Sequence, residues 1–171
     1  MMAGRVGAPV GGNLLKRAVA FAAACVFSAS CGGVDRQKFD RVYTAGNALL
    51  AEVQSNVGRA DAKARDRLKE FDAAIAALQD RAIGIQEVNA LHAYSEAADA
   101  YRSFLRFRAI DVEADSREIL LKGPNLEAAT RFRLPVDSRG GKNVVDRARA
   151  LTILLQAGEQ HLSDGNRIVG R

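Results

Sequence analysis

The side chains that hold metals or move protons in enzymes are few and scattered in this chain. There are two histidines, His92 and His161, and neither has a glutamate three residues before it. Di-iron sites in helical bundles take Glu-x-x-His from two helices, and zinc sites need three or four His, Cys or acidic ligands. A zinc site would form only if the fold joined both histidines to a carboxylate. We expect no metal site.

The chain also lacks residues that nucleophilic or glycosidic catalysis requires. The two cysteines, Cys25 and Cys31, both lie near the N-terminus, and there is no Gly-x-Ser-x-Gly turn. Glu96, Glu113 or Glu118 could in principle form a glycosidic carboxylate pair, but such enzymes need a deep cleft with aromatic subsites, and the chain has no Trp. Glycine loops of the phosphate-binding types are absent. We expect no enzymatic activity and no cofactor.

The elements that must position any site are helices. Four segments, at about 35–57, 61–82, 86–121 and 143–162, place apolar residues three and four apart. No segment alternates cleanly with period two, so we expect few strands or none. Amphipathic helices joined mostly by short turns predict an all-α fold, an antiparallel four-helix bundle or a long helical-hairpin array after an N-terminal export signal.

The apolar stripes identify the side chains that should form the core. By expected helix they are Phe39, Val42 or Tyr43, Gly46, Leu49 or Leu50, Val53 and Val57; Leu68, Phe71, Ile75, Leu78 and Ala82; Leu91, Tyr94, Ala98, Tyr101, Leu105, Val112, Ile119 and Leu120; and Val144 or Val145, Ala148, Leu151 or Thr152, Leu155 and Leu162.

Local signals place the limits of these helices. These signals are Asp35 as a first cap, Gly58 as the first stop, Gly123-Pro124 at the end of the long third helix, and Ser163-Asp164-Gly165-Asn166 at the end of the last. Between the last two helices we expect a short helical stretch at 126–132, an extended segment at 134–136 and a loop at 138–141.

The first 30 residues have the composition of an export signal. Three basic residues precede an uncharged run over 18–30, which ends in small residues just before Cys31. A secretory signal combines a basic segment, a short apolar stretch and small residues at the cleavage site. Since the run is shorter than the about 20 residues of a spanning helix, we expect export without a transmembrane anchor.

The sequence Ser28-Ala29-Ser30-Cys31-Gly32-Gly33 resembles the lipobox of bacterial lipoproteins, although that family favours Leu where this chain has Ser28. The resemblance implies cleavage before Cys31, a diacylglycerol on its sulfur and, in a Gram-negative host, an acyl chain on its amine. Cys25, after three alanines, is a competing site with a shorter apolar run before it. Ordinary signal-peptidase cleavage at the same bond would instead leave a soluble secreted protein.

These features divide the chain into a signal peptide at 1–30, a lipidated cysteine with a short tether at 31–34, and a helical domain at 35–171. Membrane lipid is then the first partner, through Cys31. What the resemblance implies for location is the outer membrane, facing the periplasm, in a Gram-negative host, because no Asp follows Cys31. Without lipidation, the protein would be periplasmic or secreted.

The basic charge of the chain does not indicate a nucleic-acid partner. Three of the 25 Lys and Arg residues lie in the first 30 residues, which leaves 22 against 20 Asp and Glu. A nearly balanced domain lacks the one-sided basic surface that nucleic-acid binding requires.

A helical domain without a catalytic set is best interpreted as a binding or structural domain. We expect a non-catalytic role with an envelope protein as partner, through an exposed apolar strip or one end of the bundle. The alternative is a soluble periplasmic protein that binds a small ligand between helices, with Tyr94, Tyr101 and Phe104 lining the pocket. A flat apolar patch would favour the first hypothesis, and an apolar cavity beside Tyr101 would favour the second.

Overall fold

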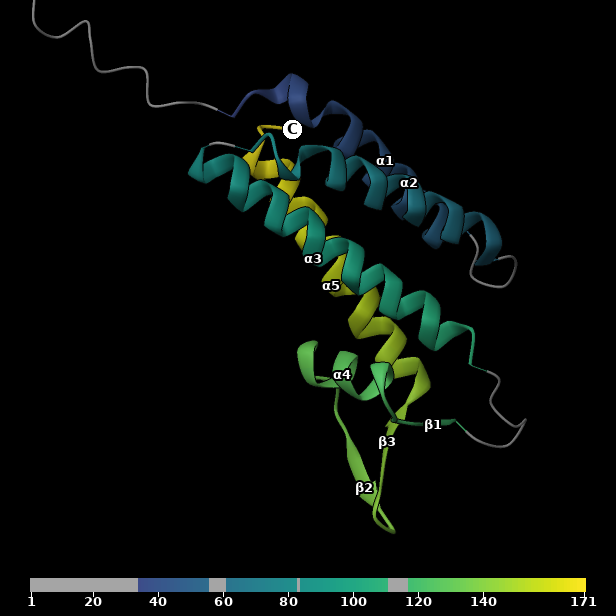
Figure 1. Cartoon of the computed structure of the whole chain (residues 1–171). Coiled ribbons are helices and arrows are strands. Elements are labelled where there is room, and N and C mark those ends of the chain that lie inside the picture. The colour runs from purple at the N-terminus through teal and green to yellow at the C-terminus, as the bar shows by residue number, and fades with distance from the viewer. Residues whose placement is uncertain (1–33, 56–60, 83, 111–116) are drawn as a thin grey trace, which may run out of the picture. The chain divides into compact units, whose positions relative to one another are not determined.

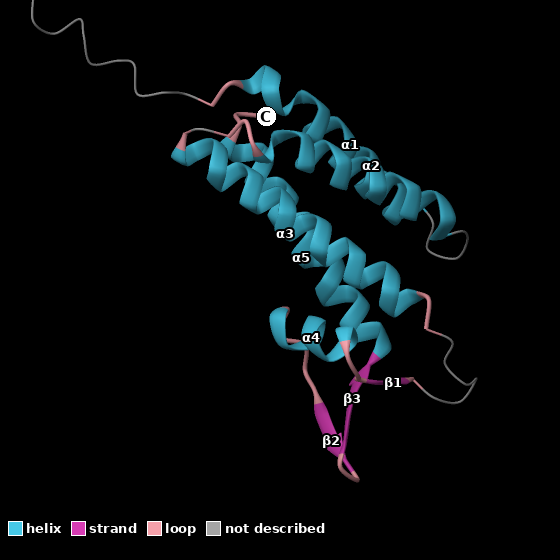
Figure 2. Cartoon of the chain, in the orientation of Figure 1, coloured by secondary structure: helices cyan, strands magenta, loops and turns pink. Residues whose placement is uncertain are grey.

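Five helices and three short strands make up the part of the chain that the computed structural model describes, residues 34–55, 61–82, 84–110 and 117–171 (Figure 1). The helices are α1 (Arg36–Ser55), α2 (Asp61–Gln79), α3 (Ile85–Arg108), α4 (Pro124–Arg131) and α5 (Arg147–Ile168), and the strands are β1 (Glu118–Leu120), β2 (Asp137–Arg139) and β3 (Lys142–Asp146). The prediction of a mainly helical domain is confirmed, with a small sheet in addition (Figure 2).

The described residues all belong to one compact unit, Val34–Arg171. The expected signal at 1–30 lies outside the described residues, as do Cys25, Cys31 and the tether before Val34. Val57, Gly58 and Val112, which the apolar stripes and stop signals included, also lie outside them.

The helices α1 and α2 form where the periodicity predicts them and pack against each other. Asp35 caps the start of α1, because its side chain accepts a hydrogen bond from the backbone amide of Gln37 at 3.1 Å. The buried apolar side chains of the pair are Phe39, Val42, Leu49 and Val53 of α1 and Ala64, Leu68, Phe71, Ala74, Ile75 and Leu78 of α2. The two predicted stripes are therefore confirmed at their centres.

The helix α3 is the most enclosed, because α2 and α5 both pack against it. The first five residues of its predicted stripe, Leu91, Tyr94, Ala98, Tyr101 and Leu105, are buried. Of the later members, Ile119 is buried and Leu120 is exposed. The predicted C-terminal limit of 121 is wrong, because α3 ends at Arg108 and Glu118–Leu120 forms a strand.

The helix α5 has different limits and a different inner face from those predicted. It begins at Arg147, where the Asp146 side chain accepts a hydrogen bond from the Arg149 backbone amide at 2.7 Å, and it continues to Ile168. Ala148, expected inside, is exposed, and of the alternatives Leu151 and Thr152 it is Leu151 that is half-buried. The buried residues are Ala150, Leu154, Gly158, Leu162 and Gly165.

The strands form an antiparallel sheet in the order β1-β3-β2, with Ile119 opposite Val145. Gly140 and Gly141, at φ +56° and +74°, make the two-residue turn between β2 and β3, a conformation that glycine adopts without strain. The loop predicted at 138–141 is therefore a tight hairpin. The helical prediction for 143–146 is wrong, because these residues pair with strands on both sides.

The helix α4 confirms the short helical stretch predicted near 126–132, although it begins two residues earlier, at Pro124. Proline suits the first turn of a helix because the amide it lacks would have no partner there. Gly123 precedes it at φ +49°. Gly123-Pro124 was expected to end the third helix, and it instead begins α4.

Candidate partner-binding surface

An open furrow of about 470 Å³ lies between α1 and α2. It is lined by Asp40, Arg41, Thr44, Ala45 and Ala48 of α1 and by Arg67 and Glu70 of α2. We call this surface the α1–α2 furrow.

The floor of the furrow is shallow because of the pattern of small residues along α1. Val42, Gly46 and Leu49 are buried. Ala45 and Ala48 come one position before Gly46 and Leu49 and are half-buried. Since alanine ends at Cβ, the backbone of an incoming segment can approach closely there.

The rim of the furrow carries both signs of charge. Asp40 and Arg41 project from α1, and on α2 Arg67 Nη1 lies 2.7 Å from Glu70 Oε2. The hydrogen bond with Glu70 raises the pKa of Arg67. This rim therefore offers donors and acceptors to a partner, and both are exposed.

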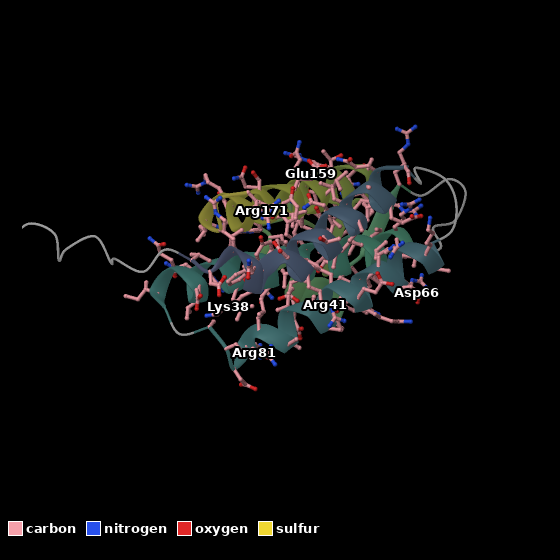
Figure 3. All side chains as sticks on the ribbon, turned by 90° about the horizontal axis from the view of Figure 1, so that it is seen from above. Lys38, Arg41, Asp66, Arg81, Glu159 and Arg171 are labelled. Carbon is pink, nitrogen blue, oxygen red and sulfur yellow. The ribbon has the colours of Figure 1, made fainter. Side chains whose placement is uncertain are left out.

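The C-terminal residue Arg171 reaches one end of this rim. Its guanidinium forms an ion pair with Asp40 and lies 5.3 Å from the centre of the Tyr43 ring. Figure 3 labels Arg171. Asp40 and Tyr43 are one turn apart on α1. The contact thus holds the C-terminus against the start of α1.

Two of the three residues predicted to line a ligand pocket are fully buried in the helical core. Tyr94 lies 6.1 Å from Phe39 and 6.2 Å from Phe71 between ring centres, and its hydroxyl donates to Asn166 Oδ1 at 2.9 Å. Tyr101 has a buried hydroxyl with no hydrogen-bond partner among the described residues. Burial raises the pKa of both tyrosines.

The third pocket residue, Phe104, is 7% exposed, and the Arg108 guanidinium lies 5.9 Å from its ring centre. None of the three residues lines the α1–α2 furrow. The ligand pocket stays a prediction.

The two histidines, the candidate metal ligands, lie on different helices. His92 is exposed on α3, and His161 is half-buried on α5. No group of three or more His, Cys, Asp or Glu within the described segments is placed to hold a metal ion.

The candidate carboxylates have arginine partners. Glu96 Oε1 lies 2.6 Å from Arg131 Nη2, and Glu118 Oε1 lies 2.9 Å from Arg139 Nη1. Glu113 lies outside the described residues.

The Glu96–Arg131 pair is part of a larger ion-pair chain across α2, α3 and α4. Arg131 also reaches Asp99 at 2.7 Å, and Arg102 pairs with Asp99 and, at 2.7 Å, with Asp72. The hydrogen bond with Glu96 contributes most to the raised pKa of Arg131, against desolvation. These charged side chains are paired with one another, and the pairs that Arg131 forms connect α4 to α3.

The apolar stripes of the sequence do not indicate the α1–α2 furrow, because the small residues of its floor lie beside the stripe of the first helix. A signal existed in Thr44, Ala45 and Ala48, three small side chains outside the core stripe of the first helix. It is weak, because alanine is also the commonest filler of helix surfaces.

Comparisons with known proteins add no relative. A scan of family models, a search of curated proteins and a search of solved structures each found no match to this chain. Within the helices that are described, none combines the length and apolar character needed to cross a membrane.

Proposed function

We propose that this chain is an exported lipoprotein, anchored through Cys31, whose helical domain binds another protein of the cell envelope without catalysing a reaction. In a Gram-negative host the anchor would lie in the outer membrane, with the domain in the periplasm. In this proposal α1, α2, α3 and α5 act as an antiparallel four-helix bundle that presents the binding surface.

The observation that carries the binding role is the α1–α2 furrow. Its alanine floor, bordered by longer side chains of α1 and α2, suits an amphipathic helix, which can lay its apolar face into such a groove. A helix pair that presents larger side chains at Ala45 and Ala48 would leave no such space. A partner helix is therefore the ligand that this surface fits.

The charges on the rim would set the direction of the bound helix. Asp40 and Glu70 would attract basic side chains of the partner, and Arg41 and Arg67 would attract acidic ones. Such pairs select among partners and contribute less to affinity than the buried floor.

The anchor is supported by the composition of the leader and by the position of its cysteine. Small residues precede Cys31, and the helical domain begins within a few residues of it. Two or more acyl chains on one cysteine give a durable attachment, whereas a single chain is marginal.

The anchor is tested by the intact mass of the detergent-extracted protein from its native host, beside a Cys31→Ala variant. A mature N-terminus at Cys31 that carries lipid mass, and loses it in the variant, supports the proposal. A bare chain cut before Cys31 contradicts the anchor, and an uncut leader contradicts export.

The binding role is tested by a photo-crosslinking amino acid at Ala48, in living cells of the same host. A matched position is Ala148, an exposed alanine on α5 away from the furrow. We expect a defined crosslinked protein from position 48 and not from 148, and a weaker product when Arg67→Glu reverses the charge at one position of the rim. Equal products from the two positions would contradict a role for the furrow.

A further inference from the structure

Two apolar side chains at the start of α3 are exposed, and no described element covers them. Ile85 is 82% exposed and Val88 is 50% exposed, more than any other large apolar side chain in the described segments. They are three residues apart, so they share one side of the first turn of α3. We call this pair the Ile85–Val88 turn.

The Ile85–Val88 turn lies at the end of the helical unit where α1 begins. Lys38 Nζ in the first turn of α1 lies 3.1 Å from Glu87 Oε1 in the first turn of α3. The start of α1, the start of α3 and the C-terminus are at the same end in Figure 1. Figure 3 shows the labelled Lys38, Arg81 and Arg171 at this end as well, and Asp66 far from it.

Covalent geometry limits how far this end can be from the lipid on Cys31. Only Gly32 and Gly33 stand between Cys31 and Val34, and a fully extended chain advances at most about 3.6 Å per residue. Val34 packs against the core, so the acylated cysteine would be within about 11 Å of the start of the folded unit. With lipid on Cys31, the hydrocarbon of the membrane would therefore be the apolar phase within reach of this end.

Two basic side chains at this end have acidic partners. Lys38 pairs with Glu87, and Arg171 pairs with Asp40. Basic side chains paired in this way contribute little attraction to anionic headgroups. A contact through Ile85 and Val88 would persist at high salt, whereas attraction of anionic headgroups to the exposed Arg36 and Arg81 would be screened, so salt separates the two.

We propose that the Ile85–Val88 turn inserts into the membrane surface and orients the domain on the bilayer by this end. The inference rests on the proposed function, because the lipid on Cys31 brings the turn to the surface. Because the lipid already holds the domain at the membrane, insertion of the turn is an intramolecular step. Even a small apolar turn would therefore be inserted for much of the time.

The test places an environment-sensitive fluorophore on a cysteine introduced by Val88→Cys. Once the leader is removed and Cys31 is acylated, this cysteine holds the only free thiol of the mature chain. The control is Ala62→Cys, because Ala62 is exposed near the start of α2. About 25 Å of helix separates it from the end of α2 that precedes α3. Both proteins, with lipid on Cys31 verified by intact mass, are reconstituted into vesicles of phosphatidylethanolamine and phosphatidylglycerol.

We expect the probe at 88 to shift to shorter wavelength with several-fold higher emission, to be quenched by spin-labelled lipid, and to keep this response at high salt. The probe at 62 should respond as it does in water, and Ile85→Asn should weaken the response at 88. A probe at 88 that stays in water although Cys31 carries lipid overturns this inference alone. Absence of lipid on Cys31 overturns the proposed function, and this inference with it. A probe at 88 that becomes apolar without vesicles as the protein concentration rises overturns membrane insertion in favour of a second copy of the chain.

Discussion

Tyr101 of α3 lies directly against the backbone of Gly158 of α5. A Cβ atom at Gly158 would stand 2.7 Å from Tyr101 Cε1, closer than packed carbon atoms approach. The same relationship recurs seven residues away on each helix, where a Cβ at Gly165 would stand 2.9 Å from Tyr94 Cε1. Because the helices are antiparallel, these two contacts fix the register in which α3 and α5 pack.

Gly158→Ala should destabilise the protein, although alanine is the better helix former. The Tyr101 ring is fully buried and cannot move aside without disturbing the core. Overpacking of this kind costs about 1–3 kcal/mol, more than the about 1 kcal/mol that alanine gains over glycine in a helix. Urea unfolding followed by circular dichroism measures the difference.

A smaller side chain at position 101 provides the control for this substitution. In a Tyr101→Leu background, Gly158→Ala should lose less stability, because the atoms that it would contact are gone. An equal loss in both backgrounds would show that the contact with the ring is not the cause.

The substitutions Tyr94→Phe and Tyr101→Phe should have opposite effects on the free energy of unfolding. The Tyr94 hydroxyl donates to Asn166 at 2.9 Å, and loss of this bond should lower stability by about 1 kcal/mol. The Tyr101 hydroxyl is buried without a partner among the described residues, so its removal should raise stability by about 1 kcal/mol. The same chemical denaturation series measures both, and effects of the same sign would contradict the assignment.

Stability should fall at alkaline pH because the two buried tyrosines must ionise on unfolding. Burial raises the pKa of Tyr94 and Tyr101 above their unfolded value of about 10, so above that pH the folded chain holds protons that the unfolded chain loses. Their contribution is complete below about pH 10 and decreases above it, by up to about 1.4 kcal/mol per pH unit for each tyrosine. The slope for Tyr101→Phe should be shallower than that of the unsubstituted chain, and identical slopes would exclude this cause.

Asp99→Asn should loosen the attachment of α4, with an effect that depends on salt. Asp99 connects Arg102 to Arg131, and all three side chains are partly exposed. Pairs of this kind are worth up to about 1 kcal/mol each and are screened by salt, so the loss should be about 1 kcal/mol at low salt and less near 1 M.

The matched control for Asp99→Asn is Asp66→Asn, because Asp66 is exposed and pairs with Lys69 on its own helix. It should change stability by less than about 0.5 kcal/mol. Hydrogen exchange of the α4 amides should rise in the Asp99 variant and not in the Asp66 variant. Equal exchange of the α4 amides in the two variants would show that packing, and not the ion pairs of Asp99, holds α4 in place.

The sequence by itself determined the parts of the fold that depend on neighbours along the chain. The starts of α1 and α2, the Asp35 cap and the buried stripe of α3 follow from apolar spacing and capping chemistry, which act within one or two turns. The same local information identified Tyr94 and Tyr101 as inward-facing side chains.

Only the tertiary structure decided the features that depend on distant residues. Val144 and Val145 fit a helical stripe, but pairing with β1 and β2 makes them a strand. Gly165 has the local character of a helix stop, yet it lies inside α5 because the Tyr94 ring occupies the space of its missing side chain. The α1–α2 furrow likewise required two helices to meet. In each case the deciding energy is a contact between segments far apart in the chain, which no local pattern encodes.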